Sequence, residues 1–346
     1  MKYIGQDDYN HDKKNDGKIG ILLCNLGTPD APDTPSLRRY LKEFLSDPRV
    51  VEVPRLIWWF ILNLIILRFR PSKSAKMYQQ VWTEDGSPLL IYSKQQLEKV
   101  KEELTQIYGD RVVFALGMRY GNPSMESAIA ELKAQNAQQV IVLPLYPQYS
   151  GATSGSTFDA LADIYKEYRW VPEITFINSY HKHPKYIQAI ANSIRQHVAQ
   201  HGKPERILFS YHGTPERYLK NGDPYYCFCQ QTTRLVKEAI TDLSFADEEL
   251  MTCFQSRFGK EPWLQPYTDE TLEALPKEGV KNIAVICPGF SSDCLETIEE
   301  IAQEGKEEFM EAGGESYHYI PALNAEPEHI EALAAVLKPY IEAHSS

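Results

Sequence analysis

Short apolar runs rich in β-branched residues recur along the chain and alternate with longer stretches whose apolar residues lie three and four positions apart. Runs of the first kind are typical of buried parallel strands, and stretches of the second kind are typical of helices. The predicted strands cover residues 19–23, 112–116, 140–145, 174–177, 207–210 and 283–286. The predicted helices cover residues 94–108, 125–137, 185–201, 232–243 and 294–312. This alternation predicts an α/β fold built from helix and sheet layers.

The length of 346 residues exceeds one usual domain core and indicates about two domains. Near residue 178 a predicted strand ends in the polar sequence SYHKHP, so we place the domain boundary there. The predicted units are a flexible polar leader, a first domain that includes residues 54–90, a second domain, and a C-terminal helix that packs back on the first domain. They cover residues 1–17, 18–178, 179–324 and 325–346.

Composition and missing motifs exclude several classes of protein. The net charge of −11 argues against a nucleic-acid binder, which needs a basic face to neutralise phosphates. Neither G-x-G-x-x-G nor G-x-x-x-x-G-K-[ST] occurs, which argues against a nucleotide enzyme, and the common zinc motifs C-x-x-C and H-E-x-x-H are missing too. The six cysteines do not form a disulfide framework, so we expect reduced thiols and a cytoplasmic protein.

The only long apolar run, LIWWFILNLIIL at residues 56–67, is too short to span a bilayer, which takes about 20 residues. Arginines 55, 68 and 70 flank it, as they would flank a segment at a membrane interface. From the pattern alone, this run is either a buried helix or an exposed lip that touches a membrane. The first 17 residues lack the apolar centre of a signal peptide.

His212 lies where the predicted strand 207–210 ends, followed by a glycine, a threonine and a proline that indicate a sharp turn. Ligands of open α/β sheets bind at the carboxyl ends of strands. A neutral imidazole there can accept a proton or bind iron near pH 7, although such a histidine can also be purely structural.

Glu296 follows the last predicted strand, in the first turn of a helix that Ser291, Ser292 or Asp293 could cap. Glutamates 296, 300, 304 and 308 recur every four residues and would share one helix face, where like charges cost about 0.2–0.5 kcal/mol per pair. Helix stability does not explain this row. It is either a solvated acidic face or a path for a divalent cation.

Aromatic and basic residues gather after other strands, at Arg119 and Tyr120, at Tyr146 and at Tyr225 and Tyr226. Singly, each of them is more often a packing residue. Together they suit a flat, apolar ligand with carboxylates, because aromatic faces stack on such a ring and a guanidinium pairs with its acid groups.

From about residue 18 to residue 340 the chain resembles the ferrochelatase family. The resemblance rests on seven blocks in order, GILLCNLGTPD, LGMRYGNP, LPLYPQYSGATSGST, LFSYHGTPERYLKNGDPYY, FQSRFGKEPWLQPYTDE, CPGFSSDCLETIEEI and YIPALNAEPEHI. It implies two Rossmann-like domains, each a parallel sheet flanked by helices, with a porphyrin cleft between them. It also implies insertion of Fe²⁺ into protoporphyrin IX to form protohaem, the terminal step of haem biosynthesis, with release of two protons.

By the same resemblance, His212 and Glu296 face each other across the cleft as catalytic and metal-binding residues. The residues that border the porphyrin are then Tyr78, Ser87, Arg119, Tyr120, Tyr146 and Trp263, to which the aromatic pattern adds Tyr225. Glu300 and Glu304 would relay protons or iron. Residues 58–67 would form part of the pocket mouth, which favours the lip and allows peripheral contact with the inner face of a membrane.

The sequence departs from the family pattern in two places. Many relatives have histidine where this chain has Cys294, so a second imidazole is not required. Some relatives bind a two-iron two-sulfur cluster through cysteines near the carboxyl end, but no cysteine follows Cys294 here, and Cys227, Cys229 and Cys253 are one short of the usual four ligands. We therefore expect no iron–sulfur cluster and no tightly bound cofactor, with Fe²⁺ acting as a substrate.

Two other functions remain open at this stage. A chelatase of the same architecture could act on coproporphyrin or a sirohydrochlorin-like ring, with cobalt or nickel in place of iron. A non-catalytic tetrapyrrole carrier would need only the pocket, and His212 and Glu296 would be superfluous in it.

Overall fold

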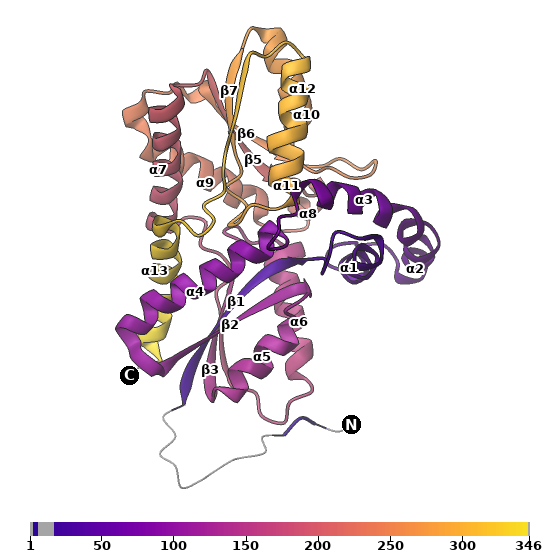
Figure 1. The fold of residues 1–346 in the computed structure, drawn as a ribbon, viewed down its shortest axis with the longest axis vertical. Coiled ribbons are helices and arrows are strands. Elements are labelled where there is room, and N and C mark those ends of the chain that lie inside the picture. The colour runs from indigo at the N-terminus through magenta and orange to yellow at the C-terminus, as the bar shows by residue number, and fades with distance from the viewer. Residues whose placement is uncertain (1–2, 6–16, 345–346) are drawn as a thin grey trace.

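The computed structural model describes residues 3–5 and 17–344, so the leader expected over residues 1–17 lies almost wholly outside the described residues. Two parallel four-stranded sheets follow one another along the long axis of the molecule, and helices flank each of them (Figure 1). The strand order is β2-β1-β3-β4 in the first sheet and β6-β5-β7-β8 in the second. The α/β fold with parallel sheets is confirmed.

The first sheet consists of β1 (Lys18–Thr28), β2 (Val112–Gly121), β3 (Ala137–Pro144) and β4 (Glu173–Phe176). The second consists of β5 (Arg206–His212), β6 (Leu250–Gln255), β7 (Asn282–Ile286) and β8 (Ser316–Ile320). All six predicted strands are present. Strands β6 and β8 were not predicted.

The α-helices are α1 (Thr34–Ser46), α2 (Arg55–Ile61), α3 (Leu67–Val81), α4 (Pro88–Tyr108), α5 (Met125–Ala134), α6 (Ser156–Tyr165), α7 (Pro184–His201), α8 (Glu216–Lys220), α9 (Tyr225–Ala239), α10 (Thr268–Ala274), α11 (Leu295–Thr297), α12 (Gly305–Glu311) and α13 (Pro327–Ala343). Three π-helices are η1 (Leu62–Ile66), η3 (Gly151–Gly155) and η7 (Ile298–Glu304). The 3₁₀ turns are η2 (Gly109–Arg111), η4 (Thr241–Leu243), η5 (Asp247–Glu249) and η6 (Leu275–Glu278).

Contacts between the two halves hold the sheets in one arrangement. The largest apolar cluster includes Ile21 of the first sheet and Phe209 of the second, so one core runs through both. Helix α13 contacts α4 and β3 of the first half and α7 of the second. The buried Gln96 side chain on α4 donates from Nε2 to the carbonyls of Ser291 and Asn324, each at 2.9 Å. These contacts fix where the loop before α11 lies relative to the first sheet.

The apolar run at residues 56–67 is helical and projects from the first half through α2, η1 and α3 (Figure 1). Trp58, Leu62 and Leu67 are buried in one cluster with residues of α1. Ile61 and Ile66 are partly buried against the same cluster. Seven other large apolar side chains are about half exposed or more, and they are Leu56, Ile57, Trp59, Phe60, Leu64, Ile65 and Phe69. Among the described residues no helix has the length and apolar character needed to cross a membrane.

Candidate active site

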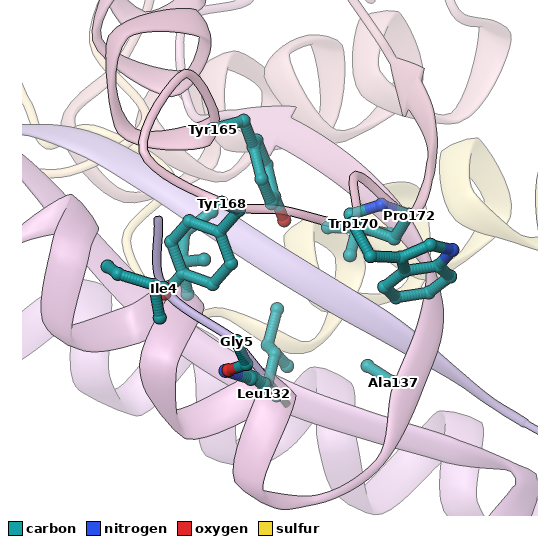
Figure 2. Close-up of a pocket in the computed structure, with 11 residues that line it drawn as sticks. Ile4, Gly5, Leu132, Ala137, Tyr165, Tyr168, Trp170 and Pro172 are labelled. Carbon is teal, nitrogen blue, oxygen red and sulfur yellow. The ribbon is translucent and has the colours of Figure 1, made fainter. Parts of the chain in front are cut away.

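Two cavities in the described part of the chain are candidate places for chemistry. The first lies against the first sheet, where Ile4 sits beside Leu132, Tyr165, Tyr168 and Trp170 (Figure 2). Its lining is mostly apolar, and Lys133 is its one charged residue. The second contains several carboxyl groups and lies at the carboxyl end of β6, which pairs with β5. The second cavity is therefore the better candidate for acid–base or metal chemistry.

His212 is the last residue of β5 and is half-buried. Its Nδ1 lies 2.7 Å from the carbonyl oxygen of Gly213. A carbonyl can only accept, so Nδ1 carries the proton in this contact and Nε2 keeps its lone pair. A Cβ at Gly213 would lie 2.8 Å from the Gln255 carbonyl and 3.2 Å from the ring of Trp263. The turn thus requires glycine, and it brings Trp263 against the segment that presents His212.

Glu296 lies in the short helix α11, in the first turn as predicted. The predicted caps Ser291, Ser292 and Asp293 are wrong, because Cys294 is the N-cap and its backbone N–H donates to Thr297 Oγ1 at 3.0 Å.

Asp293 has a different role from capping. Its buried carboxylate accepts hydrogen bonds from Thr297 Oγ1 at 2.9 Å, Tyr319 Oη at 2.6 Å and Asn324 Nδ2 at 2.7 Å. It also accepts from the Ala322 N–H at 3.3 Å. These contacts hold the loop that positions Glu296 one turn later.

The predicted helix over residues 294–312 is divided, because the π-helix η7 separates α11 from α12. A π-helix bonds each residue to the fifth one along and has a wider turn than an α-helix. Glu300, Glu304 and Glu308 line one cavity of about 170 Å³, together with Asp269 and Arg257. Three of the four glutamates in the row therefore share one face, as the four-residue spacing predicted.

Glu300 connects this cavity to His212. Its Oε1 accepts from the Ser256 N–H at 2.7 Å, and its Oε2 from Ser256 Oγ at 2.5 Å. Burial raises the pKa of Glu300, while the Ser256 hydrogen bonds and the charge of His212 lower it and the charge of Glu296 raises it again. His212 and Glu296 thus both act electrostatically on the same carboxyl group.

Farther along the row, the carboxyl groups are crowded by one another. Burial, followed by the charge of Glu304, raises the pKa of Glu308 to about 7. Glu299 behaves similarly, because burial and then the charges of Glu304 and Glu300 raise its pKa. These groups can exchange protons much closer to neutral pH than an ordinary glutamate can.

The first half presents buried tyrosines toward Glu296. Burial and then the Glu296 carboxylate raise the pKa of Tyr78 on α3. Burial, the neighbouring Tyr78 and Glu296 raise the pKa of Tyr40 on α1 in the same way, and Tyr146 and Tyr120 add to the effect. These hydroxyls stay protonated near neutral pH. They form a largely apolar wall with hydrogen-bond donors opposite the glutamate row.

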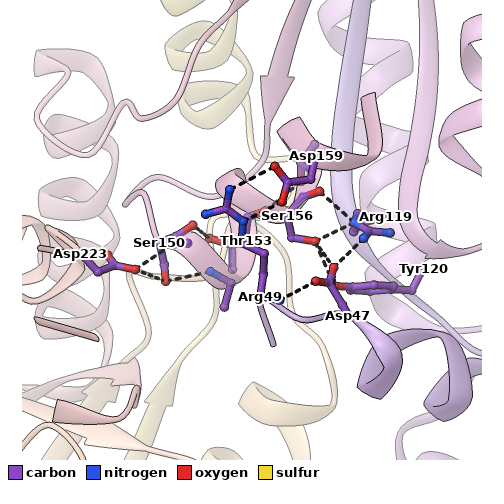
Figure 3. Close-up of polar contacts among 12 residues, drawn as sticks. Asp47, Arg49, Arg119, Tyr120, Ser150, Thr153, Ser156, Asp159 and Asp223 are labelled. Atoms are coloured by element: carbon purple, nitrogen blue, oxygen red, sulfur yellow. Dashed lines mark hydrogen bonds and ion pairs between the residues drawn. The ribbon is translucent and has the colours of Figure 1, made fainter. Parts of the chain in front are cut away.

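A polar network surrounds the hydroxyl group of Tyr120 (Figure 3). Asp47, at the end of α1, accepts from Arg119 Nη2 at 2.5 Å, Tyr120 Oη at 2.8 Å and Ser156 Oγ at 2.5 Å. Arg119 also donates from Nε to Ser156 Oγ at 2.6 Å. The guanidinium of Arg119 is therefore already paired with a buried carboxylate.

Comparisons with known proteins agree on one family. The Ferrochelatase family profile matches residues 18–340. A ferrochelatase of Alcanivorax borkumensis is 54% identical over 342 residues, covering 99% of this chain and 99% of that protein. One of Hydrogenovibrio crunogenus is 56% identical over 341 residues, covering 97% of this chain and 89% of the relative. The chain belongs to the ferrochelatase family.

Solved structures agree with the ferrochelatase fold. The structure described as SirB from Bacillus subtilis with Fe³⁺ superimposes with a TM-score of 0.51, covering 95% of this chain and 97% of that one. Its sequence is 13% identical, so the likeness shows the fold alone. Ferrochelatase membership makes the chain a lyase of haem biosynthesis, a metal chelatase.

The residues predicted to border the porphyrin of this ferrochelatase occupy different surroundings. Ser87 caps the start of α4, where its Oγ accepts from Thr28 Oγ1 at 2.8 Å. Tyr146 is half-buried, and its buried hydroxyl has no hydrogen-bond partner among the described residues. Tyr225 is packed into the shared core, and its pKa is raised by burial and by Cys229. The structure thus brings Tyr78, Tyr120 and Tyr146 to one wall and places Tyr225 apart from it.

Sequence reasoning missed Tyr40, Asp47 and Glu299 of this ferrochelatase site. Tyr40 and Asp47 lie on or beside α1, a helix that was not predicted. The signal was present as an aspartate followed by Thr-Pro at the helix start, where the Asp33 side chain caps α1 by accepting from the Ser36 N–H at 2.7 Å.

Proposed function

We propose that His212 and Glu296 perform the metal insertion in this ferrochelatase, which inserts Fe²⁺ into protoporphyrin IX, forms protohaem and releases two protons. The observation that carries the proposal is the linkage of the two residues through Glu300, whose carboxyl group responds to the charge of both. Insertion needs a proton acceptor and a group that delivers the cation, and an imidazole and a carboxylate can supply them. Gln255, which pairs with His212 between β5 and β6, also donates from Nε2 to the Glu296 carbonyl at 2.8 Å.

His212 is proposed to accept the pyrrole protons. Its Nδ1 proton is directed to the Gly213 carbonyl, which leaves the Nε2 lone pair available. When Nε2 takes up a proton, the ring becomes a cation, and the nearby Glu300 carboxylate stabilises that charge. Glu296 is proposed to bind the incoming ferrous iron, because carboxylate oxygens bind and release such ions readily.

Glu300 and Glu304 are proposed to carry protons out of the site or iron into it. The support is the cavity of about 170 Å³ that they share with Glu308 and that extends away from His212 along η7. The glutamates in it have little pairing with cations, so they are free to exchange a proton or hold an ion in passing.

The porphyrin is proposed to lie against the wall formed by Tyr78, Tyr120 and Tyr146 and to meet Trp263 near His212. Buried aromatic rings give a flat apolar ligand faces on which to stack. Arg119 and Ser87 belong to the same wall. Because Arg119 is paired with Asp47, it is proposed to position Tyr120 rather than to supply a free charge to the substrate.

The test of the site is iron insertion under anaerobic conditions, followed by the absorption spectrum of protoporphyrin IX. We expect His212→Ala and Glu296→Gln to lower turnover about 100-fold or more, the range in which loss of a proton-transfer group falls. His183→Ala and Glu307→Gln serve as matched controls outside the site and should keep wild-type turnover. Full activity in either site variant contradicts the proposal.

The role of His212 has its own readout in the pH profile. A protonated imidazole cannot accept a pyrrole proton, so turnover should fall toward acid pH over the window of about pH 5 to 8 in which histidines change charge. Binding of the porphyrin, followed by tyrosine or porphyrin fluorescence, should change less. A flat turnover profile across that window would remove His212 from the role of base.

We also propose that the α2–η1–α3 segment rests on the inner face of a membrane at the mouth of the site. The support is its row of exposed apolar side chains, which includes Leu56 at 73% and Phe69 at 71% exposure, beside Arg55 and Arg68. Wild type should co-sediment with vesicles that contain anionic lipid, and a Leu56→Ser/Phe69→Ser double variant should stay in the supernatant. Equal sedimentation of both proteins contradicts this contact.

The reaction is further proposed to need no tightly bound cofactor and no iron–sulfur cluster. Cluster ligands are thiolates, whereas burial raises the pKa of Cys229 and Cys253 and favours their neutral thiols. Anaerobically purified protein should contain no acid-labile sulfide. A stoichiometric amount of sulfide would contradict the proposal.

A further inference from the structure

Three of the nine histidines of the chain lie together at the outer edge of the second sheet, away from the candidate active site. The ring centroids of His197 and His201 are 4.8 Å apart, those of His201 and His318 are 4.5 Å apart, and those of His197 and His318 are 5.2 Å apart. Each ring thus contacts both others.

The fold places these rings together for simple geometric reasons. On α7 the buried positions Ile190, Ile194 and His197 follow one another at four- and three-residue spacing, and His201 continues that row in the last turn. On the edge strand β8, the Tyr317 hydroxyl donates to the Ile301 carbonyl of η7, so this side chain lies on the face of the sheet opposite to α7. His318, its neighbour in the strand, therefore points toward the layer that contains α7.

Packing alone does not account for three imidazoles here. No described residue makes a hydrogen bond to the ring nitrogens of His197, His201 or His318, and His197 is only 8% exposed. None of these ring nitrogens is both fully buried and without a partner, but an apolar side chain at position 197 would gain more from its burial than an imidazole does. Three neighbouring imidazoles are also unfavourable when they are protonated, because any two positively charged rings repel each other.

We infer that His197, His201 and His318 form a binding site for one divalent transition-metal ion of the zinc and nickel type, separate from the iron-insertion site. Imidazole suits these ions, and three histidines hold catalytic zinc in other proteins. Tetrahedral zinc with nitrogen at roughly 2.0–2.1 Å sets the centroids of its imidazole ligands roughly 5 Å apart. The three measured separations lie close to that value.

The charge state of the rings agrees with this assignment. Burial, and then the neighbouring His201 and His318, lower the pKa of His197 to about 4. Burial, His201 and Lys306 on α12 lower the pKa of His318. A metal ligand must be the neutral imidazole, so these rings need not lose a proton at neutral pH. The carbonyls at the end of α7 add a favourable field for a cation beside His201.

Within the described part of the chain, the His, Cys, Asp and Glu side chains in their present orientations form no group of three or more that could hold a metal ion. The planes of His201 and His197 are inclined by 32°, and those of His201 and His318 by 36°. Directing three nitrogens at one ion therefore requires rotation of rings. His201 is exposed and His318 is half-buried, and such side chains change rotamer within nanoseconds.

The experiment is a calorimetric titration of the porphyrin-free enzyme with Zn²⁺ at neutral pH. His201→Gln and His318→Gln should each bind one equivalent of Zn²⁺ fewer than wild type, or bind that equivalent at least about tenfold more weakly. Removing a residue that only hydrogen-bonds to a metal ligand already weakens metal binding about tenfold or more. His183→Gln, at the opposite end of α7, is the matched control and should keep the wild-type stoichiometry. Every variant retains His212 and Glu296, so ions bound there cancel in the comparison.

A second readout separates metal binding from a folding defect. Zn²⁺ or Ni²⁺ should raise the Tm of wild type and of His183→Gln, but not that of His201→Gln, whose exposed position makes it the variant least able to disturb the fold. Identical stoichiometry and identical Tm shifts in all four proteins would overturn the inference.

Discussion

Asp47 in the first half of the molecule and Glu300 in the second are both carboxyl groups withdrawn from water, but their surroundings differ. Asp47 accepts three side-chain hydrogen bonds, one of them from the Arg119 guanidinium. Glu300 accepts hydrogen bonds from Ser256, but a second carboxylate, Glu296, lies near enough to raise its pKa. The first half thus uses a buried charge to fix its wall. The second half gathers carboxyl groups of like charge, and burial together with that crowding raises the pKa of Glu300 and Glu308.

The largest effect on stability is expected at Asp47. Asp47→Asn leaves the Arg119 charge without its partner in a site where the Asp47 side chain is 3% exposed, so the free energy of unfolding should fall by about 3 kcal/mol. Denaturant unfolding measures this loss. Asp163→Asn, in a surface pair whose acid side chain is 71% exposed, should change stability little. Equal losses in the two variants would erase the contrast between the halves.

The next largest effect concerns turnover at Glu300. Glu300→Gln keeps the shape and a hydrogen-bond acceptor for Ser256 but cannot carry a proton, so kcat for iron insertion should fall roughly tenfold, less than for loss of a direct proton acceptor. Stability should not fall, because a buried carboxyl group with raised pKa is removed. Glu307→Gln is the control, because Glu307 lies on α12 beside the row, is exposed and does not line the cavity. Unchanged kcat would mean that the glutamate row is only a solvated acidic face and takes no part in the reaction.

A smaller effect is expected in the pH dependence of stability. The pKa of Glu308 is about 7 in the folded protein against an ordinary value of 4.5, so the folded state binds the extra proton between these two pH values. Stability should therefore decrease as pH rises from about 4.5 to about 7, by about 1 kcal/mol after allowance for solvent screening. Glu308→Gln should flatten this part of the curve, as measured by Tm at each pH.

The first half should show the opposite trend. Burial alone would raise the pKa of Asp47, but hydrogen bonds from Ser156, the Arg49 N–H and Tyr120 hold it below the ordinary 3.8. Its contribution is present above that pH and is lost as pH falls farther. A Glu308→Gln variant with an unaltered slope from pH 4.5 to 7 would mean that the two halves do not differ in this respect.

The smallest effect is expected at Arg49. Its guanidinium pairs with Asp159 through Nε at 2.7 Å and Nη2 at 3.1 Å, but both side chains are 42% exposed. Arg49→Gln should therefore cost only about 0.5 kcal/mol in denaturant unfolding, as exposed pairs do. A loss as large as that of Asp47→Asn would show that burial does not set the strength of this network.

Much of the fold could be predicted from the sequence because parallel strands that are buried on both faces are continuous apolar runs, as in β1, β3 and β7. Strands β6 and β8 escaped prediction for a physical reason. The sequence LMTCFQ of β6 and the sequence SYHYI of β8 mix polar and half-buried residues and contain no continuous apolar run. All four strands β2, β4, β6 and β8 lie at sheet edges, but β2 and β4 keep apolar runs and were predicted, so the polar content of β6 and β8 decided the outcome.

The parts of the candidate site that could be predicted are those in which a residue lies at the end of one strand or recurs along one helix. His212 was found because it ends a strand, and the glutamate row because its spacing repeats. Asp47 could not be found in this way. Its partners lie more than 70 residues away in sequence at Arg119 and more than 100 away at Ser156, and only the folded chain brings them together.

The π-helix η7 has one more consequence, which concerns insertions and deletions. Because its turn is wider by about one residue than an α-helical turn, it is equivalent to a helix that has received one extra amino acid. Removing Ala302 would allow one continuous α-helix in place of η7, with Glu300 and Glu308 seven positions apart instead of eight. Seven α-helical residues turn through about 700°, which is about 20° short of two full turns, so Glu308 would still share the face of Glu300. The wide turn can therefore lose one residue without moving the glutamates on either side of it to different faces.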